Sequence, residues 1–525
     1  MKRVLFLVCC LFTLSSFAQS RMIRSGELWP DDRGQHINAH GGGILQYQDT
    51  YYWFGEHKSE RTSDALVGVT CYASDDLVHW RYCGVALSVV DERGHDIERG
   101  CVLERPKVIY NKVTGKFCMW FHLELKGRGY DAARYGVAVA DRPEGPYKFL
   151  YTQRADAGTW PMEFDQQALA VVDTLKEAHF REAWTPAWQK AVAQGLIVKR
   201  DFGTGQMSRD MTLYVDDDGK AYHIFSSEEN LTLHIAELTG DYLHHTGRYT
   251  RVAPAGHNEA PAIFKHEGTY WMITSGCTGW APNEARMFSA PSIWGPWTQH
   301  PNPCRGPRAE LTFGGQSTFI LPLNSKLSTI NSQYIFMADI WRPHHPIDAR
   351  YIWLPIEFED GKPVIHWRDE WEMTPEDLDE KYATSLIKPG RKAPDFKMKT
   401  PDGELLQFSK LAKGKTVVLD FWASWCPDCR KDAPKVVRMY EKFHQKGIEF
   451  IGISMDTDVE AWKKAIARYG ITYPQLSELK KFKETAISKT YGVQWIPSMV
   501  VVGPDGKVKL STVMTYKVED YLNGI

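Results

Sequence analysis

Five stretches of the chain share one pattern of apolar and polar residues. In each, a short apolar run leads into a turn that contains Gly or Ser, and an aromatic-rich run follows. Strand-length runs joined by such turns are typical of β-hairpins. The stretches are GGGILQYQDTYYWFGE (41–56), RPKVIYNKVTGKFCMWFH (105–122), MTLYVDDDGKAYHIFSS (211–227), APAIFKHEGTYWMITSG (260–276) and STFILPLNSKLSTINSQYIFMAD (317–339).

These hairpins predict a five-bladed β-propeller over residues 22–372. Later turns such as SDDLVHW (74–80) and PSIWGPW (291–297) indicate that a further strand pair completes some units, as expected of small sheets repeated around an axis. A β-sandwich would also contain many short strands, but it does not explain similar hairpins at long intervals. ALAVVDTLKEA and PAWQKAVAQG have helical spacing, so we expect a helical insertion at about residues 160–200.

The composition changes beyond Trp371, where TPEDLDEKYATSLIKPGRKAPDF is polar and marked by proline. We interpret residues 373–388 as a linker. In residues 389–525, VVLDFWA and IEFIGISM are typical of strands, DAPKVVRMYEKFHQK and DVEAWKKAIARYG of helices, and SMVVVGPDGKVKL of a terminal hairpin. The chain is therefore predicted to be multidomain, an all-β propeller followed by an α/β thioredoxin-like domain.

The first residues have a basic start, an apolar stretch and small residues near Ala18, which predicts a signal peptide at 1–19. Cys9 and Cys10 lack the small preceding residue of a lipoprotein site, so cleavage is favoured over lipid anchoring. No later run is long enough for a membrane span, and we expect an exported protein, periplasmic or extracellular. With 63 basic and 65 acidic residues, the chain has no basic field for nucleic acid.

A polar residue stands at the start of each predicted unit: His40, Glu104, Asp210, Glu259 and Gln316. Any one of them could be a solvated strand end or a cap. The innermost strands of a propeller line one channel, however, so all five are expected to converge at its mouth. Carboxylates facing one another across a cleft suit glycoside hydrolysis, in which one carboxyl must stay protonated. Burial and the neighbouring charge of Asp210 would keep the proton on Glu259.

Long stretches of residues 22–372 resemble glycoside hydrolase family 43, and within it the exo-β-1,3-galactanase and β-galactosidase-like branch. They include AHGGGILQYQDTYYWFGEHK, VLERPKVIYN, SRDM, HNEAPAIFKHEGTYW, SGCTGWAPN and WRPHHPIDARYIWLP. The resemblance implies an inverting enzyme that acts on an oligo- or polysaccharide with terminal β-galactosyl linkages. It makes Glu259 the general acid, Asp210 its pKa modulator and Glu104 a further substrate contact.

The catalytic base departs from the wider family's pattern. Most members have an aspartate base in the first blade, whereas this chain reads NAHGGG there. The galactanase branch also lacks that aspartate, and Gln316 matches the glutamine assigned there to the attacking water. A neutral amide orients water but accepts a proton weakly. We expect Gln316 to position water, with a purely substrate-binding role as the alternative.

Four more residues are candidates for substrate binding. Trp280 and Trp341 could supply faces for sugar stacking or belong to the core. Arg350 could bind a hydroxyl or support the last blade, and His40 fits a hydroxyl-binding or supporting role. The cysteines and carboxylates lack the usual spacing of a metal site, so we expect no metal.

FWASWCPDC places Cys426 and Cys429 two residues apart, between a strand and a helix. The helix N-terminus would stabilise the thiolate of Cys426, Asp428 would oppose it, and Cys429 would resolve. Half of a zinc site is the alternative, but no second cysteine pair is present.

VLDFW, KAPDF, WCPDC and WIPSM resemble exported thioredoxins of the TlpA and ResA type. That resemblance makes Asp420 the buried proton relay and Pro497 the cis-proline opposite the motif. It implies a redox-active Cys426–Cys429 disulfide, no other cofactor, and a thiol-disulfide redox partner that the sequence does not identify. A second hypothesis keeps this chemistry and makes the propeller a carbohydrate-binding platform without hydrolase activity.

Overall fold

The computed structural model describes residues 22–48, 50–180, 182–323, 333–373 and 382–525. The expected signal peptide lies outside them. The chain divides into two compact units, Arg21–Pro375 and Glu376–Ile525, and each is described by itself. In the described ranges, no helix is long and apolar enough to cross a membrane.

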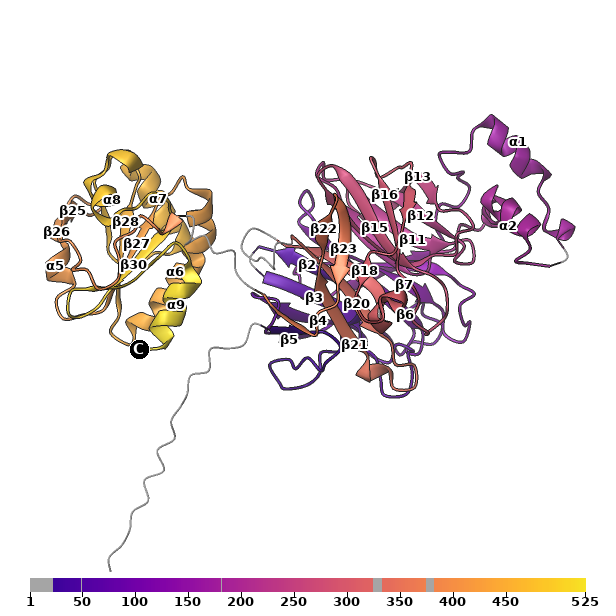
Figure 1. Cartoon of the computed structure of the whole chain (residues 1–525), viewed down its shortest axis with the longest axis horizontal. Helices are drawn as coiled ribbons and strands as arrows, with labels where there is room; N and C mark the ends of the chain where they lie inside the picture. The colour runs from indigo at the N-terminus through magenta and orange to yellow at the C-terminus, as the bar shows by residue number, and fades with distance from the viewer. Residues whose placement is uncertain (1–21, 49, 181, 324–332, 374–381) are drawn as a thin grey trace, which may run out of the picture. The chain divides into compact units, whose positions relative to one another are not determined.

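Four sheets of four antiparallel strands make up most of the first unit (Figure 1). The first two sheets contain β2 (His40–Tyr47), β3 (Thr50–Glu56), β4 (Gly68–Ser74) and β5 (Arg81–Ser88), then β6 (Val102–Asn111), β7 (Lys116–Glu124), β8 (Arg134–Ala140) and β9 (Lys148–Gln153). The next two contain β10 (Met211–Val215), β11 (Ala221–Ser227), β12 (Thr232–Leu238) and β13 (His245–Val252), then β14 (Glu259–His266), β15 (Thr269–Ser275), β16 (Arg286–Ala290) and β17 (Thr298–His300).

Two three-stranded sheets complete the propeller. One runs β19 (Gln316–Pro322), β20 (Tyr334–Ile340) and β21 (Arg350–Pro355), and the other joins β18 (Cys304–Arg305), β23 (Lys362–His366) and β22 (Glu357–Glu359). The described residues therefore form six blade-like sheets, and the prediction of five is wrong in its count. The sixth has strands of two, three and five residues, which are too short to give a recognisable hairpin pattern.

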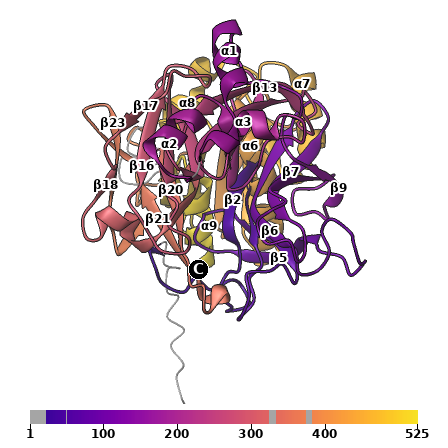
Figure 2. The same ribbon diagram turned by 90° about the vertical axis from the view of Figure 1, so that its right-hand side faces the viewer.

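The first strands of five sheets form a ring around the axis. β2 contacts β6, β6 contacts β10, β10 contacts β14, β14 contacts β19, and β19 returns to β2. In Figure 2, β2 and β6 lie near the centre of the propeller, whereas β9 and β17 lie towards its periphery. The chain ends of this unit also meet, because β1 (Met22–Arg24) pairs with β24 (Glu370–Glu372). This arrangement brings residues that are distant in sequence to one axis.

Short helices lie between and after the sheets. α1 (Gln166–Thr174), η1 (Glu177–His179), α2 (Pro186–Ala193) and α3 (Leu196–Asp201) occupy the segment where a helical insertion is expected, between β9 and β10. α1 and α2 stand out from the propeller in Figure 1. η2 (Ala309–Gly314) precedes β19, and η3 (Pro346–Asp348) lies between β20 and β21.

The second unit is a seven-stranded sheet in the order β26-β25-β29-β28-β27-β30-β31. Its core is apolar, and β27, which is buried throughout, lies in parallel with β28 and antiparallel to β30. The strands are β25 (Lys397–Lys399), β26 (Leu405–Gln407), β27 (Val417–Trp422), β28 (Glu449–Ser454), β29 (Gln475–Ser477), β30 (Ser498–Val502) and β31 (Val508–Thr512). The helices are α5 (Phe408–Leu411), α6 (Pro427–His444), α7 (Val459–Tyr469), η4 (Phe482–Glu484), α8 (Ala486–Tyr491) and α9 (Thr515–Asn523). This is the α/β thioredoxin-like arrangement predicted for the C-terminal region.

Candidate active sites

The five polar residues singled out in the sequence occupy equivalent places on the ring strands. Each lies opposite the end of the second strand of its sheet. The pairs are His40 with Glu56, Glu104 with His122, Glu259 with Ser275, and Gln316 with Asp339, while the Asp210 carbonyl accepts a hydrogen bond of 2.9 Å from the Ser226 amide. Glu104 is the third residue of its strand rather than a residue ahead of it, but the pairing still aligns it with the others.

A β-bulge recurs directly after three of these residues. Gly41, Arg105 and Ala260 have φ angles of 60°, 55° and 52°, and the strand register shifts just beyond each. Bulges of this kind re-aim side chains next to active sites. A non-glycine residue in the left-handed region is uncommon, and its strain persists only where surrounding contacts hold it. Arg105 and Ala260 therefore mark a constrained site.

Three successive glycines let the first ring strand pass close to its neighbours. A Cβ atom at Gly42 would lie 1.7 Å from the Phe54 carbonyl oxygen, and one at Gly43 would lie 2.6 Å from Cδ of Lys107. The buried ammonium of Lys107 donates to the carbonyl oxygens of Gly41 at 2.9 Å and Arg105 at 3.3 Å. This lysine thus joins the bulges of the first two sheets.

Glu259 has the electrostatic environment of a general acid. Its Oε1 accepts a hydrogen bond of 2.7 Å from Asn230 Nδ2. The thiol of Cys277, which donates to the Asn230 carbonyl at 3.7 Å, acts to lower the pKa of Glu259. Burial and the negative charge of Asp210 raise the pKa of Glu259 to about 7, against the opposing charge of Arg105. Near neutral pH the carboxyl is therefore partly protonated and able to donate a proton.

Arg105 connects the site across three ring strands. Its guanidinium donates to Asp210 Oδ2 at 2.8 Å, to Gln316 Oε1 at 2.5 Å and to the Ser317 carbonyl at 3.0 Å. Asp210 is therefore held by an ion pair while it acts electrostatically on Glu259. Arg105 is not among the residues predicted from the sequence, although it directly follows Glu104.

The amide of Gln316 is fixed by its neighbours. Its Oε1 accepts from both Arg105 and Trp341 Nε1, the latter at 2.8 Å, and its Nε2 donates to Ser275 Oγ at 2.9 Å. Arginine and tryptophan are donors only, so these bonds determine which end of the amide is oxygen. One N–H of Nε2 has no part in these bonds, and it is the group on Gln316 best placed to orient a water.

Glu104 is an ionised carboxylate held by two side chains. Its Oε2 lies 3.2 Å from His122 Nδ1, and its Oε1 accepts from the Tyr130 hydroxyl at 3.0 Å. Burial opposes ionisation, but the contacts with His122 and the charge of Lys58 outweigh it and lower the pKa of Glu104 to about 2.

His122 carries the matching positive charge. Burial disfavours the charged ring, but the hydrogen bonds with Glu104 and Glu124 outweigh it and raise the pKa of His122 to about 9. Ligand atoms of Glu104, His122 and Asp210 lie within 4.8 Å of one another. Two of the predicted acids therefore meet at one point, where protonated His122 and Arg105 balance their charges.

Two of the proposed substrate-binding residues do not face an open site. His40 is completely buried, stacked on Tyr351 at 5.2 Å and 3.7 Å from Asp339. Of the two roles expected for it, these contacts favour the supporting one. Arg350 donates to Asp348 at 2.5 Å and 3.1 Å, so its contacts are those of a residue that supports the last ring sheet.

The two tryptophans lie together at the site. Trp280 and Trp341 meet edge to face, with ring centroids 5.7 Å apart, and Trp280 is 41% exposed. The Trp341 ring also lies 5.3 Å from the Arg105 guanidinium carbon. An exposed indole beside Trp341, which bonds to Gln316, is suited to stacking on a sugar.

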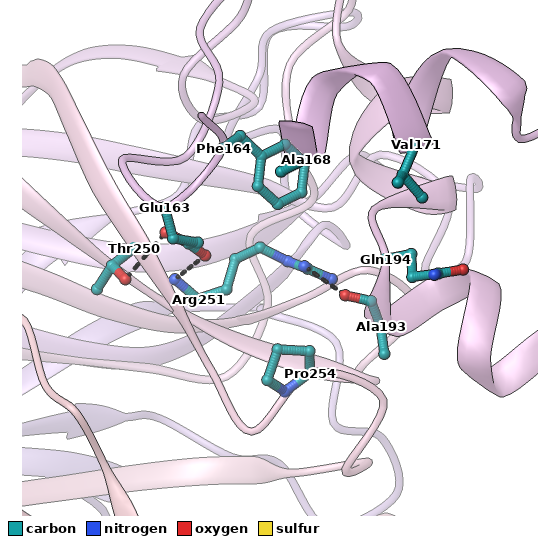
Figure 3. A pocket seen from close by; sticks show the side chains of 9 residues that line it. All are labelled: Glu163, Phe164, Ala168, Val171, Ala193, Gln194, Thr250, Arg251 and Pro254. Atoms are coloured by element: carbon teal, nitrogen blue, oxygen red, sulfur yellow. Dashed lines mark hydrogen bonds between the residues drawn. The ribbon is translucent and has the colours of Figure 1, made fainter. Parts of the chain in front are cut away.

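A separate pocket of about 380 Å³ lies between the helical insertion and β13. Figure 3 shows that its polar groups bond to one another: Glu163 accepts from Thr250 and from the Arg251 amide, and Arg251 donates to the Ala193 carbonyl. Because none of the predicted site residues lines it, this pocket is not the candidate active site.

The thiol site of the second unit lies at the start of α6. Cys426 caps this helix by accepting from the Cys429 amide at 3.2 Å, and its thiol donates to the Ile496 carbonyl at 3.5 Å. The hydrogen bond from the Cys429 thiol lowers the pKa of Cys426, against burial and the charge of Asp428. Burial raises the pKa of Cys429 far above its usual value. Cys426 is thus the more nucleophilic thiol.

Asp420 lies beneath this pair. Burial raises its pKa to about 7, although the Tyr473 hydroxyl donates to it at 2.9 Å. Its charge acts on Cys429, as expected of a group that exchanges a proton with the resolving cysteine. The peptide bond between Ile496 and Pro497 is cis, at the residue whose carbonyl contacts Cys426.

Comparisons with known proteins agree with this geometry. Residues 184–326 match the model of glycosyl hydrolases family 43. A family 43 β-1,3-galactosidase, solved with galactodeoxynojirimycin, is 57% identical over 67% of this chain and 100% of its own, with a TM-score of 0.64. The exo-β-1,3-galactanase of Phanerochaete chrysosporium is 31% identical over 72% of this chain and 75% of its own, with a TM-score of 0.52. The propeller and its acid cluster define a glycoside hydrolase. The chain belongs to glycosyl hydrolase family 43.

The second unit has its own relatives. Residues 389–511 match the AhpC/TSA family model. The thiol-disulfide oxidoreductase ResA of Bacillus thuringiensis (strain Al Hakam) is 34% identical over 119 residues, which are 23% of this chain and 66% of that relative's length. ResA of Bacillus subtilis (strain 168) is 28% identical over 140 residues, or 75% of its length. Residues 389–511 therefore form a thioredoxin-like domain that is similar to thiol-disulfide oxidoreductases.

Proposed function

We propose that the propeller hydrolyses terminal β-galactosyl linkages of galactan-type substrates with inversion of the anomeric carbon. The observation that supports this best is Glu259, a half-buried carboxyl whose pKa is raised to about 7 beside Asp210. Both the galactosidase and the galactanase to which the chain is similar act on β-1,3-linked galactose by name. Trp280 and Glu104 would hold the sugar.

In the proposed reaction, Glu259 donates its proton to the leaving oxygen as the glycosidic bond breaks. Asp210, oriented by Arg105, favours the protonated form of Glu259 before the reaction. Gln316 would orient the attacking water through an Nε2 hydrogen. The amide oxygen already accepts two hydrogen bonds, so Gln316 positions the water and does not act as a strong base.

We further propose that the C-terminal domain exchanges disulfides through Cys426, with Cys429 as the resolving thiol and Asp420 as the proton relay. The basic and apolar N-terminal residues support export by a signal peptide, and so a periplasmic or extracellular location. The redox partner would be a protein thiol or disulfide.

One experiment tests both assignments. Galactose release from a β-1,3-galactan and reduction of insulin disulfides are measured for Glu259→Gln and Cys426→Ser. We expect the first variant to lose only galactose release and the second only insulin reduction. The product anomer, read by NMR within the first minutes, should be α if the reaction inverts. A Glu259→Gln variant with full galactose release would refute the glycosidase assignment, and a β product would refute inversion.

A further inference from the structure

Two cysteines of the first sheet, Cys71 on β4 and Cys83 on β5, are in contact. The strands are antiparallel, with Cys71 opposite Gly84, and the register then shifts so that Tyr72 lies opposite Tyr82. Cys83 is therefore the extra residue of a β-bulge, next to the residue that pairs with Cys71. Cys83 packs against the apolar cluster that contains Cys71. The Cys71 thiol donates to the Tyr72 carbonyl at 3.8 Å and the Cys83 thiol to the Arg81 carbonyl at 3.7 Å, and both are free thiols in this structure.

We propose that Cys71 and Cys83 form a reversible cross-strand disulfide. In a bulge two residues, here Cys83 and Gly84, face one residue of the other strand, here Cys71. Directly opposed Cα atoms are about 4.5–5.5 Å apart, and a disulfide tolerates Cα separations of about 4.4–6.8 Å, which leaves room for the neighbouring bulge residue to pair with Cys71. Gly84 follows Cys83 with a φ of 111°, a backbone conformation that glycine adopts readily. The bulge thus brings Cys83 close to Cys71. Its neighbour Gly84 has no side chain that would stand between the two cysteines.

The two thiols are suited to different steps. Cys83 is partly exposed, whereas Cys71 has no exposed surface. The thiol of Cys71 and the nearby Arg81 lower the pKa of Cys83, while burial raises the pKa of Cys71. The accessible thiol with the greater thiolate character reacts first with an external disulfide, so Cys83 is the attacking sulfur and Cys71 the resolving one.

The exchange balances with a disulfide of the glutathione class as oxidant. The Cys83 thiolate attacks one sulfur of that disulfide, which forms a mixed disulfide and expels one thiolate. Cys71 gives its proton to the expelled thiolate, attacks the Cys83 sulfur and expels the second thiolate, which takes up the proton that Cys83 had released. Two electrons and two protons pass from the cysteine pair to the oxidant, and a dithiol reverses the reaction.

Peptide mapping tests this proposal without reference to the glycosidase activity. The full chain is equilibrated with glutathione disulfide, remaining thiols are alkylated, and the peptides are identified by mass spectrometry. We expect a Cys71–Cys83 linked peptide in most molecules and its loss after dithiothreitol. Two outcomes would overturn the proposal: both cysteines remaining alkylated as thiols, or Cys83 stopping at the glutathione mixed disulfide.

Thermal unfolding with a matched pair of variants provides the second readout. Cys71→Ala and Cys101→Ala each remove a fully buried thiol from the same core cluster. The difference in Tm between oxidised and reduced protein is compared within each variant, so that the cost of the substitution cancels. Closing a loop of about 13 residues should raise the Tm by about 4 °C. Cys101→Ala should keep this rise in Tm on oxidation, and Cys71→Ala should lose it. An equal rise in both variants would contradict the proposal.

Discussion

Replacing Asp210 by Asn removes the negative charge that helps to keep Glu259 protonated. The pKa of Glu259 is raised from its ordinary 4.5 to about 7, with burial as the largest cause and Asp210 as the next. That rise corresponds to about 3 kcal/mol in favour of the protonated carboxyl, and the charge of Asp210 supplies part of it. Arg105, freed from its ion pair with Asp210, would lower the pKa of Glu259 further.

The expected result is a shift in the basic limb of the pH profile. A general acid must be protonated to act, so activity is lost as the pH rises through its pKa. If the pKa of Glu259 falls from about 7 to about 6, the protonated fraction at pH 7 drops from about a half to about a tenth. The loss from this cause is about fivefold at pH 7 and small at pH 5.

The assay is kcat/KM for galactose release between pH 4 and pH 9, because that ratio reports the free enzyme. Asp217→Asn serves as the matched control. Asp217 is an exposed aspartate of the same sheet that pairs with Lys265, so its loss should leave the basic limb of the pH profile in place. Loss of rate at all pH values is also expected, since Asp210 orients Arg105. A basic limb that stays near 7 or moves upward in Asp210→Asn would refute the electrostatic reasoning.

Three further predictions concern single contacts. Cys277→Ala removes a thiol that lowers the pKa of Glu259, so the basic limb of the pH profile should move upward. A downward shift would contradict this. Gly43→Ala places a Cβ 2.6 Å from Cδ of Lys107 and should lower the free energy of unfolding by about 1–3 kcal/mol. The control Gly203→Ala adds a Cβ that meets nothing within 4 Å and should leave it unchanged. Equal denaturation midpoints for the two variants would argue against the close approach. Asp420→Asn removes a buried acid with a pKa of about 7 and should slow insulin reduction at neutral pH. Equal rates for the variant and the wild type would contradict this.

The sequence predicted the ring residues because their recurrence is local. Each polar residue directly precedes or begins an apolar run, and a propeller brings equivalent positions to one axis. Glu104, Asp210 and Glu259 therefore could be found from spacing and from the quoted motifs. The cysteine pair of WCPDC was equally accessible, because its strand and helix are contiguous in the chain.

Other parts depended on contacts that spacing does not encode. The sixth sheet joins strands as short as two residues from separate segments, and no periodicity marks them. Arg105 acquires its role from a positive φ and from contacts with residues 210 and 316. Asn230 and Cys277 reach Glu259 from two loops. One signal in the sequence could have shown part of this network. Polar residues lie near the ends of the second strands, such as His122 and Asp339, and they pair with ring residues.

The most direct test of the central claim compares two leaving groups in Glu259→Gln. A β-1,3-galactan needs a proton on its departing oxygen, whereas a dinitrophenyl galactoside does not. If Glu259 is the general acid, kcat on galactan should fall by about 10²–10⁴-fold, while kcat on the dinitrophenyl substrate should stay within about tenfold of the wild type. An equal loss on both substrates, or none on either, would contradict the account.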